Sequence, residues 1–261
     1  MAIRKAKYFA NMIHEISGRE TIIPRISKVK SPRELAMWLR SFLEVDIPKG
    51  RPSQILSYYK RIIEKRMNIL VIEYPMKTED VRAFSIKDKL SIVVLNENDK
   101  PSIKLFSLFH EIAHVLRKEE GICSIVPEQE NRDIERFCDS FAAEFLVPYG
   151  EFVKDVERFG TDYGAIKEMQ KKYGVTVQVL MLRLLNLGYI TKQAYDDFRK
   201  RFDKEKKTGG GGKNWETVFR NRVGNIAIEE VSKAFRKGEI SFHEAMRILD
   251  LKAKYAERFI G

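Results

Sequence analysis

The chain alternates between two patterns of hydrophobic and polar residues, and its first part follows the helical pattern. In residues 31–45, apolar side chains recur every three or four positions behind Ser31 and Pro32. Serine is a favoured helix cap and proline a favoured first helical residue, so this stretch predicts an amphipathic helix. Residues 53–67 repeat the spacing and predict a second helix. We therefore interpret residues 1–66 as a helical N-terminal lead-in.

The pattern then changes to that of strands in three short segments, which read NILVIEY (68–74), VRAFSI (81–86) and LSIVVL (90–95). These segments are rich in β-branched residues and are separated by turn-forming residues, which is typical of strands. The helical spacing returns in 102–118, 130–146, 150–158, 161–173, 176–187 and 191–206. The sequence thus predicts an α+β fold, with a small antiparallel sheet and mainly helices, whose core spans residues 67–207.

A run of four glycines interrupts these patterns near the C-terminus. Such a run is flexible, so residues 208–213 are predicted to be a Gly-rich linker to a helical C-terminal domain at 214–261. The motif GGGGK lacks the earlier glycine and the following Ser or Thr of a phosphate-binding loop. Two interpretations of the C-terminal domain stay open. One is a helix-turn-helix-like DNA-binding domain, and the other is a helical cap that packs on the core or mediates self-association.

The net charge of +11 is divided unevenly along the chain. Residues 1–66 carry +9 (15 basic, 6 acidic), residues 67–199 carry −4 (18 basic, 22 acidic) and residues 200–261 carry +6 (15 basic, 9 acidic). A basic flank can meet nucleic acid, an acidic partner or water. DNA contact through the basic termini is therefore a hypothesis and not a conclusion.

Membrane and secreted proteins are the classes that the sequence excludes. No apolar run approaches the roughly 18 residues that a membrane span needs. The N-terminus interrupts its apolar stretches with Asn11, His14 and Glu15, so it lacks the apolar region of a signal peptide. Two cysteines, Cys123 and Cys138, are too few for a disulfide scaffold. We expect a cytoplasmic protein.

The segment FHEIAH (109–114) carries the strongest chemical signal. His110 and His114 are four residues apart, so on a helix their imidazoles share one face and can bind one cation. Glu111 follows the first histidine, as in the HExxH motif of zinc hydrolases, where this glutamate is the general base. The alternative is a pair of buried core histidines without a metal.

A zinc site needs a third protein ligand, and the helix predicted at 130–146 offers one. Glu135 and Asp139 share one helix face, on which Glu135 could bind the metal and Asp139 could orient a ligand histidine. This spacing after HExxH resembles that of the thermolysin-like zincins, or gluzincins. Three alternatives remain: a solvated face of Glu135 and Asp139 near Arg132 and Arg136, a different carboxylate ligand (Glu128, Glu130 or Asp133), and Cys138 as a thiolate ligand.

These features, taken in order, resemble the ImmA/IrrE family of metallopeptidases over roughly residues 50–200. The family pattern is HExxH followed by a helix of the form E-x-x-A-[ND]-x-F-A that ends in proline, and here this helix reads ERFCDSFAAEFLVP. Cys138 stands where alanine is common, and Asp139 occupies the Asn/Asp position. The resemblance implies a zincin-like domain with Zn2+ bound by His110, His114 and Glu135, and with Glu111 as the catalytic carboxylate.

The resemblance also implies a function and a partner. Members often cleave, or act on, a helix-turn-helix repressor, so we expect a zinc-dependent endopeptidase that cuts a regulatory protein of this kind. Glu111 would act as the general base on a water molecule bound to zinc. We further hypothesise that the edge of the strand at 90–95 pairs with the extended substrate. The alternative function is a non-catalytic DNA- or repressor-binding protein of a phage or toxin–antitoxin module.

Overall fold

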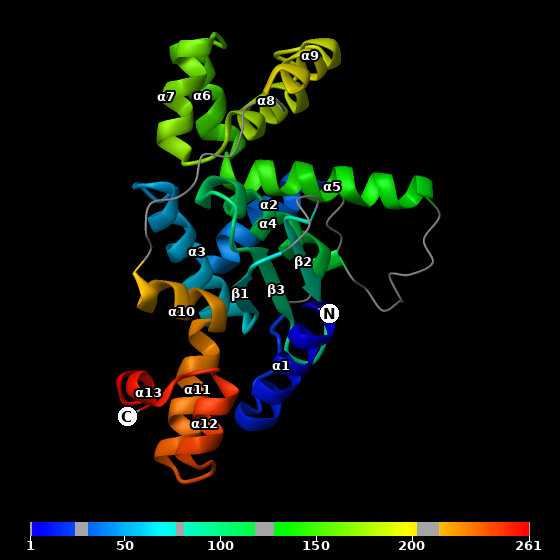
Figure 1. Cartoon of the computed structure of the whole chain (residues 1–261). Coiled ribbons are helices and arrows are strands. Elements are labelled where there is room, and N and C mark those ends of the chain that lie inside the picture. Colours follow the sequence, from blue (N-terminus) through cyan, green and yellow to red (C-terminus); the bar gives the residue numbers. More distant parts are fainter. Residues whose placement is uncertain (1, 24–30, 77–80, 118–127, 203–213, 261) are drawn as a thin grey trace. The chain divides into compact units, whose positions relative to one another are not determined.

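The computed structural model describes residues 2–23, 31–76, 81–117, 128–202 and 214–260, and its contacts define two compact units (Figure 1). The first unit combines three segments, Met1–Pro24, Tyr59–Asn98 and Gly212–Gly261. The second unit combines Arg25–Tyr58 and Asp99–Gly211. The division predicted from the sequence, by contrast, is sequential, and its linker at 208–213 lies outside the described residues.

A three-stranded sheet forms the centre of the first unit. Its strands are β1 (Leu70–Tyr74), β2 (Ala83–Ile86) and β3 (Ile92–Asn96), in the order β1-β3-β2. All five positions of β3 are buried, whereas all four positions of β2 are half-buried. A strand that is buried throughout belongs in the middle of a sheet, and a partly solvated one belongs at an edge. All three strands predicted from the sequence are present in the structure at the predicted positions.

The predicted antiparallel arrangement is wrong for one of the two strand pairs. β2 and β3 are antiparallel, with Ala83 opposite Leu95, but β1 and β3 are parallel, with Leu70 opposite Ile92. The sheet is mixed because β2 pairs on the far side of β3 and not with β1. Since β3 has a strand on each side, the hypothesis that this strand offers an edge to substrate is also wrong.

The first unit also contains helices from both ends of the chain and the end of a helix from a third segment. They are α1 (Ala2–Ser17), the end of α3 (Pro52–Met67), α10 (Trp215–Val223), α11 (Asn225–Arg236), α12 (Phe242–Ile248) and α13 (Ala253–Ile260). One apolar core joins Ile13 of α1, Val94 of β3 and Val231 of α11. The predicted lead-in did not identify α1, although Ala6, Ala10 and Ile13 are buried at helical spacing.

Polar contacts fix the C-terminal helices to the rest of the first unit. The Lys60 ammonium donates to Asn221 Oδ1 at 3.0 Å and lies 3.3 Å from Glu73 Oε1. Glu64 accepts hydrogen bonds from the backbone N–H of Asn225 at 3.0 Å and from its side-chain amide at 2.6 Å. Of the helices of 214–260, α10 and α11 contact β1, whereas α12 and α13 pack on α11. DNA contact through this region stays a prediction.

In the second unit, all the secondary-structure elements that the structure describes are helices. It contains α2 (Pro32–Leu43), the start of α3, α4 (Pro101–Arg117), α5 (Glu128–Leu146), α6 (Tyr149–Phe159), α7 (Tyr163–Tyr173), α8 (Val177–Asn186) and α9 (Lys192–Phe202). Ser31 caps α2, because its hydroxyl accepts from the Glu34 N–H and Glu34 accepts from the Ser31 N–H, each at 3.2 Å.

Helix α5 is the central element of the second unit and packs against α2, α4 and α8. Stacked rings of Phe109 on α4 and Phe145 on α5, with centroids 3.9 Å apart, join the two helices that carry the candidate site. The predicted α+β class with mainly helical content is confirmed. Among the described helices, none combines the length and apolar character that crossing a membrane requires.

Candidate metal centre

Helix α4 is largely buried, and its two histidines lie on the side that reaches the surface. Its residues Leu108, Phe109 and Ile112 are fully buried, which fixes the rotation of the helix. The side chains of His110 and His114 are 17% and 16% exposed, so both rings reach the surface from the same helix face. Glu111, the next residue along, is 9% exposed. The helical spacing predicted for HExxH is confirmed.

Helix α5 brings two carboxylates to this face of α4. Cys138 and Ala142 are fully buried, and these small residues let the two helices approach closely. Glu135 and Asp139 lie one turn apart and remain about half exposed, at 48% and 46% of their side chains. Both carboxylates contact His110, so they are not a solvated face. Arg136 instead pairs with Asp133, at 3.4 Å.

Three donor atoms meet at one point between these helices. His110 Nε2 lies 3.1 Å from His114 Nε2 and 3.1 Å from Glu135 Oε2, and His114 Nε2 lies 3.3 Å from Glu135 Oε1. In a tetrahedral zinc site with bonds of about 2.0–2.1 Å, donor atoms are about 3.4 Å apart. The spacing of these imidazole and carboxylate groups therefore fits one ion, and all three ligand atoms lie within 4.8 Å of one another.

Asp139 determines which nitrogen of His110 faces that point. Its Oδ1 lies 2.9 Å from His110 Nδ1. A carboxylate acceptor places a proton on Nδ1, so in the neutral ring Nε2 is the nitrogen with a lone pair for a metal. Burial lowers the pKa of His110, but the hydrogen bond to Asp139 and the charges of Asp139, Glu111 and Glu135 outweigh it and raise this pKa. The three carboxylates around His110 therefore favour a positive charge on or beside this ring.

Cys138 does not join this group of donor atoms. Only His110, His114 and Glu135 form such a cluster among the residues that the structure describes. Burial, and then the charge of Glu135, raises the pKa of the Cys138 thiol to about 12. Zinc binds the thiolate, so this environment disfavours Cys138 as a ligand and fits a small packing residue. Of the other proposed carboxylates, Asp133 is also absent from the cluster, and the side chains of Glu128 and Glu130 lie outside the described residues.

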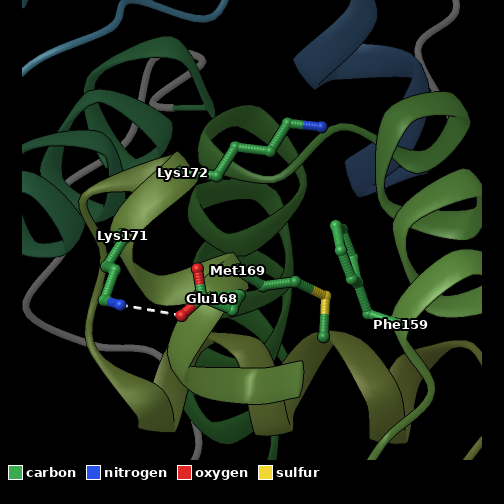
Figure 2. Close-up of a pocket in the computed structure, with 5 residues that line it drawn as sticks. All are labelled: Phe159, Glu168, Met169, Lys171 and Lys172. Carbon is green, nitrogen blue, oxygen red and sulfur yellow. Dashed lines mark hydrogen bonds and ion pairs between the residues drawn. The ribbon is translucent and has the colours of Figure 1, made fainter. Parts of the chain in front are cut away.

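A separate pocket lies at α6 and α7 and contains none of the candidate residues. Its volume is about 380 Å³, and Figure 2 shows the lining residues Phe159, Glu168, Met169, Lys171 and Lys172. The ammonium of Lys171 pairs with Glu168 at 2.7 Å, and that of Lys172 pairs with Asp155 at 2.7 Å. Both ammonium groups are thus paired with carboxylates of the same two helices.

Comparisons with known proteins match one segment of the chain to a described family. The family model Peptidase_M78, described as an IrrE N-terminal-like domain, matches residues 64–185, a range that contains both site helices. No curated protein matches the chain. A solved structure, a Mycobacterium tuberculosis transcriptional regulator, is similar at 15% identity with a TM-score of 0.45.

That similarity covers 69% of this chain and 49% of the regulator, so the chain spans about half of the regulator's length. A likeness of this degree carries no conclusion about function. The family model, in contrast, matches the segment in which the HExxH helix and the Glu135 helix pack together. Residues 64–185 thus match an IrrE N-terminal-like domain, and this match supports the resemblance of the chain to the ImmA/IrrE family of metallopeptidases.

Proposed function

We propose that the protein is a zinc-dependent endopeptidase that cleaves a regulatory protein. The observation that carries this proposal is the convergence of His110 Nε2, His114 Nε2 and a Glu135 oxygen within 3.1–3.3 Å of one another. Two imidazoles and one carboxylate form a ligand set that catalytic zinc sites use, and it leaves a fourth position open. The family match supports peptidase chemistry at this site.

Zinc is the metal that best fits these donors. Imidazole nitrogen suits zinc and other transition metals, whereas magnesium and calcium prefer sites made of oxygen atoms alone. When bound, zinc polarises a peptide carbonyl and lowers the pKa of a water molecule toward about 7. In this proposal His110, His114 and Glu135 hold the ion, and the other residues of the site supply proton transfer and orientation.

Glu111 is the general base of the proposed reaction. Its carboxylate lies close enough to His110 for its charge to raise the pKa of that ring. It follows His110 directly on α4, so it stands beside the ligands without belonging to the cluster. Glu111 would take a proton from the attacking water and return it to the nitrogen of the leaving segment.

Asp139 is a positioning residue in this proposal. By accepting a hydrogen bond from Nδ1–H, with an N···O distance of 2.9 Å, it holds the His110 ring in one tautomer and orientation. The carboxylate also makes the opposite nitrogen a stronger donor to the metal. Asp139 therefore acts through His110 and does not contact the substrate.

The proposed substrate is a helix-turn-helix repressor or another regulatory protein. This part of the proposal rests on the resemblance to the ImmA/IrrE family, whose members act on such repressors. The basic termini are available for DNA or for an acidic partner. The competing function is a protein that binds a repressor or DNA without cutting either.

Incubation of the zinc-loaded protein with candidate repressors, read by mass spectrometry, separates these functions. We expect a cut product that a chelator abolishes. Glu111→Gln should retain zinc and lose cleavage, whereas Glu157→Gln, a matched change at an exposed position of α6, should keep both. Cleavage at the wild-type rate by Glu111→Gln would overturn the mechanism. Binding with no cut product from any candidate would favour the competing function.

A further inference from the structure

An arginine extends the metal-binding face of α4 by one turn. His110, His114 and Arg117 are spaced i, i+4 and i+7, so they share one face of the helix. At a rise of about 1.5 Å per residue, Arg117 lies roughly 4.5 Å further along the helix axis than His114. Arg117 is exposed, whereas the two histidines are half-buried. A cation therefore stands at the rim of the metal centre.

The Arg117 side chain is held in place by an aromatic ring of α5. Its guanidinium lies over the ring of Phe137, 4.1 Å from the ring centroid. Phe137 stands between Glu135 and Asp139 in the sequence, so this contact ties Arg117 to the helix that supplies the other site residues. A guanidinium that stacks by its face leaves the N–H groups along its edge free to bind an anion.

The charges around the metal centre make this arginine distinctive. Glu111, Glu135 and Asp139 carry three negative charges, and a zinc ion brings only two positive ones. Of the arginines on α5, Arg136 is already paired with Asp133, at 3.4 Å. Within the residues described, no carboxylate pairs with Arg117. A substrate carboxylate that approached these acidic groups would be attracted by the guanidinium of Arg117.

We propose that Arg117 is a specificity-determining residue that binds a carboxylate of the substrate. The carboxylate would lie about one or two residues from the scissile bond, since an extended peptide advances about 3.3–3.6 Å per residue. This carboxylate belongs either to an acidic side chain of the substrate or to its C-terminus. In both cases a carboxylate forms a bidentate pair with the Arg117 guanidinium. This proposal rests on the proposed peptidase function.

Peptide hydroxamates test Arg117 without requiring turnover. A hydroxamate binds the metal, so a matched series reports only on the flanking residues. One pair carries Asp or Asn in the first two positions beside the hydroxamate, and a second pair ends in a free carboxylate or an amide. The affinities for the zinc-loaded full chain are measured by calorimetry, together with Arg117→Ala, Arg117→Lys and Arg158→Ala. Arg158 is the matched control, because it lies over the Phe159 ring at 5.0 Å on α6.

In the wild-type protein, we expect the acidic member of one pair to bind about tenfold more tightly than its neutral partner. The pair that shows this preference identifies the source of the carboxylate. Arg117→Ala should bring the ratio to about one while its zinc content stays at the wild-type level, Arg117→Lys should retain part of the preference, and Arg158→Ala should retain all of it. An equal ratio in wild type and Arg117→Ala overturns the role of Arg117. Failure of every hydroxamate to bind overturns the peptidase proposal, and this inference with it.

Discussion

The Nδ1 atom of His110 lies 2.9 Å from Oδ1 of Asp139, while its Nε2 atom lies 3.1 Å from Oε2 of Glu135. One imidazole thus connects two carboxylates of the same helix, one turn apart. The first carboxylate fixes the proton on Nδ1, and this leaves the second nitrogen as a lone-pair donor facing Glu135 and His114. Together with His114 Nε2, these atoms form the ligand set that we propose for one zinc ion.

Removal of the Asp139 carboxylate should weaken metal binding without removing a ligand. We expect Asp139→Ala to lower zinc affinity by about 10–100-fold, because the His110 ring loses the group that fixes its tautomer. Asp139→Asn should lose less, since its amide oxygen can still accept from Nδ1. Competition with a fluorescent chelator measures the affinity, and circular dichroism checks the fold. Unchanged affinity in Asp139→Ala would show that Asp139 does not position His110.

Gly224 tests whether the C-terminal helices belong to the first unit. Its φ is +84°, and a Cβ there would lie 2.9 Å from Glu64 Oε1 and 3.5 Å from the Val71 carbonyl oxygen. Gly238 also has a positive φ, at +72°, but a Cβ there meets nothing within 4 Å. Gly224→Ala should therefore cost about 1–3 kcal/mol in free energy of unfolding, and more than Gly238→Ala. Equal losses in denaturant unfolding would argue against this packing.

Glu64 should make the free energy of unfolding depend on pH. Burial raises the pKa of Glu64 above its ordinary value of 4.5, although the bonds from Asn225 and the charge of Lys60 oppose this. The folded state then binds the proton more tightly than the unfolded chain does. The resulting stabilisation is fully present below pH 4.5 and is lost as the pH rises through the raised pKa.

Glu64→Gln removes this dependence, because the amide does not titrate. The stability of this variant relative to wild type should rise as the pH increases above 4.5. Denaturant unfolding at a series of pH values measures the difference. Glu257→Gln, at an exposed position of α13, is the control and should follow the wild type. A Glu64→Gln difference that stays constant with pH would refute the raised pKa.

A buried ion pair holds α5 and α8 together in the second unit. Arg183 Nη2 lies 2.6 Å from Glu144 Oε2, and the side chains are 3% and 5% exposed. Arg183→Met should cost about 3–5 kcal/mol in free energy of unfolding, because it leaves the Glu144 charge buried without a partner. The double variant Arg183→Met, Glu144→Leu should recover part of this loss. A single-variant loss no larger than that of a surface substitution would contradict the prediction.

Local sequence signals predicted most of the helices. Ser31 and Ser241 are helix caps in the structure, each with the reciprocal bond from a glutamate three residues later. The direction of β1 relative to β3 was not predictable in this way, because the local pattern of a strand does not specify its neighbour. The assembly of the first unit from three separate segments likewise depends on long-range packing that no local motif encodes.

The candidate site was predictable where helical spacing alone determines geometry. His110 and His114 share a face by spacing, and so do Glu135 and Asp139. The stacking of Arg117 on Phe137 was missed, because it requires the relative rotation of α4 and α5. The buried state of Cys138 follows from the same packing, and Cys138 is absent from the cluster of His110, His114 and Glu135.

Zinc content is the most direct test of a metal shared by His110, His114 and Glu135. The protein is loaded with zinc, separated from free metal, and analysed by mass spectrometry of the intact complex together with the three single alanine variants. We predict one zinc ion per wild-type chain and loss of that ion from the His110→Ala and His114→Ala chains, with strongly weakened binding in Glu135→Ala. Absence of zinc from the wild-type chain, or full retention by all three variants, would contradict the assignment of this site.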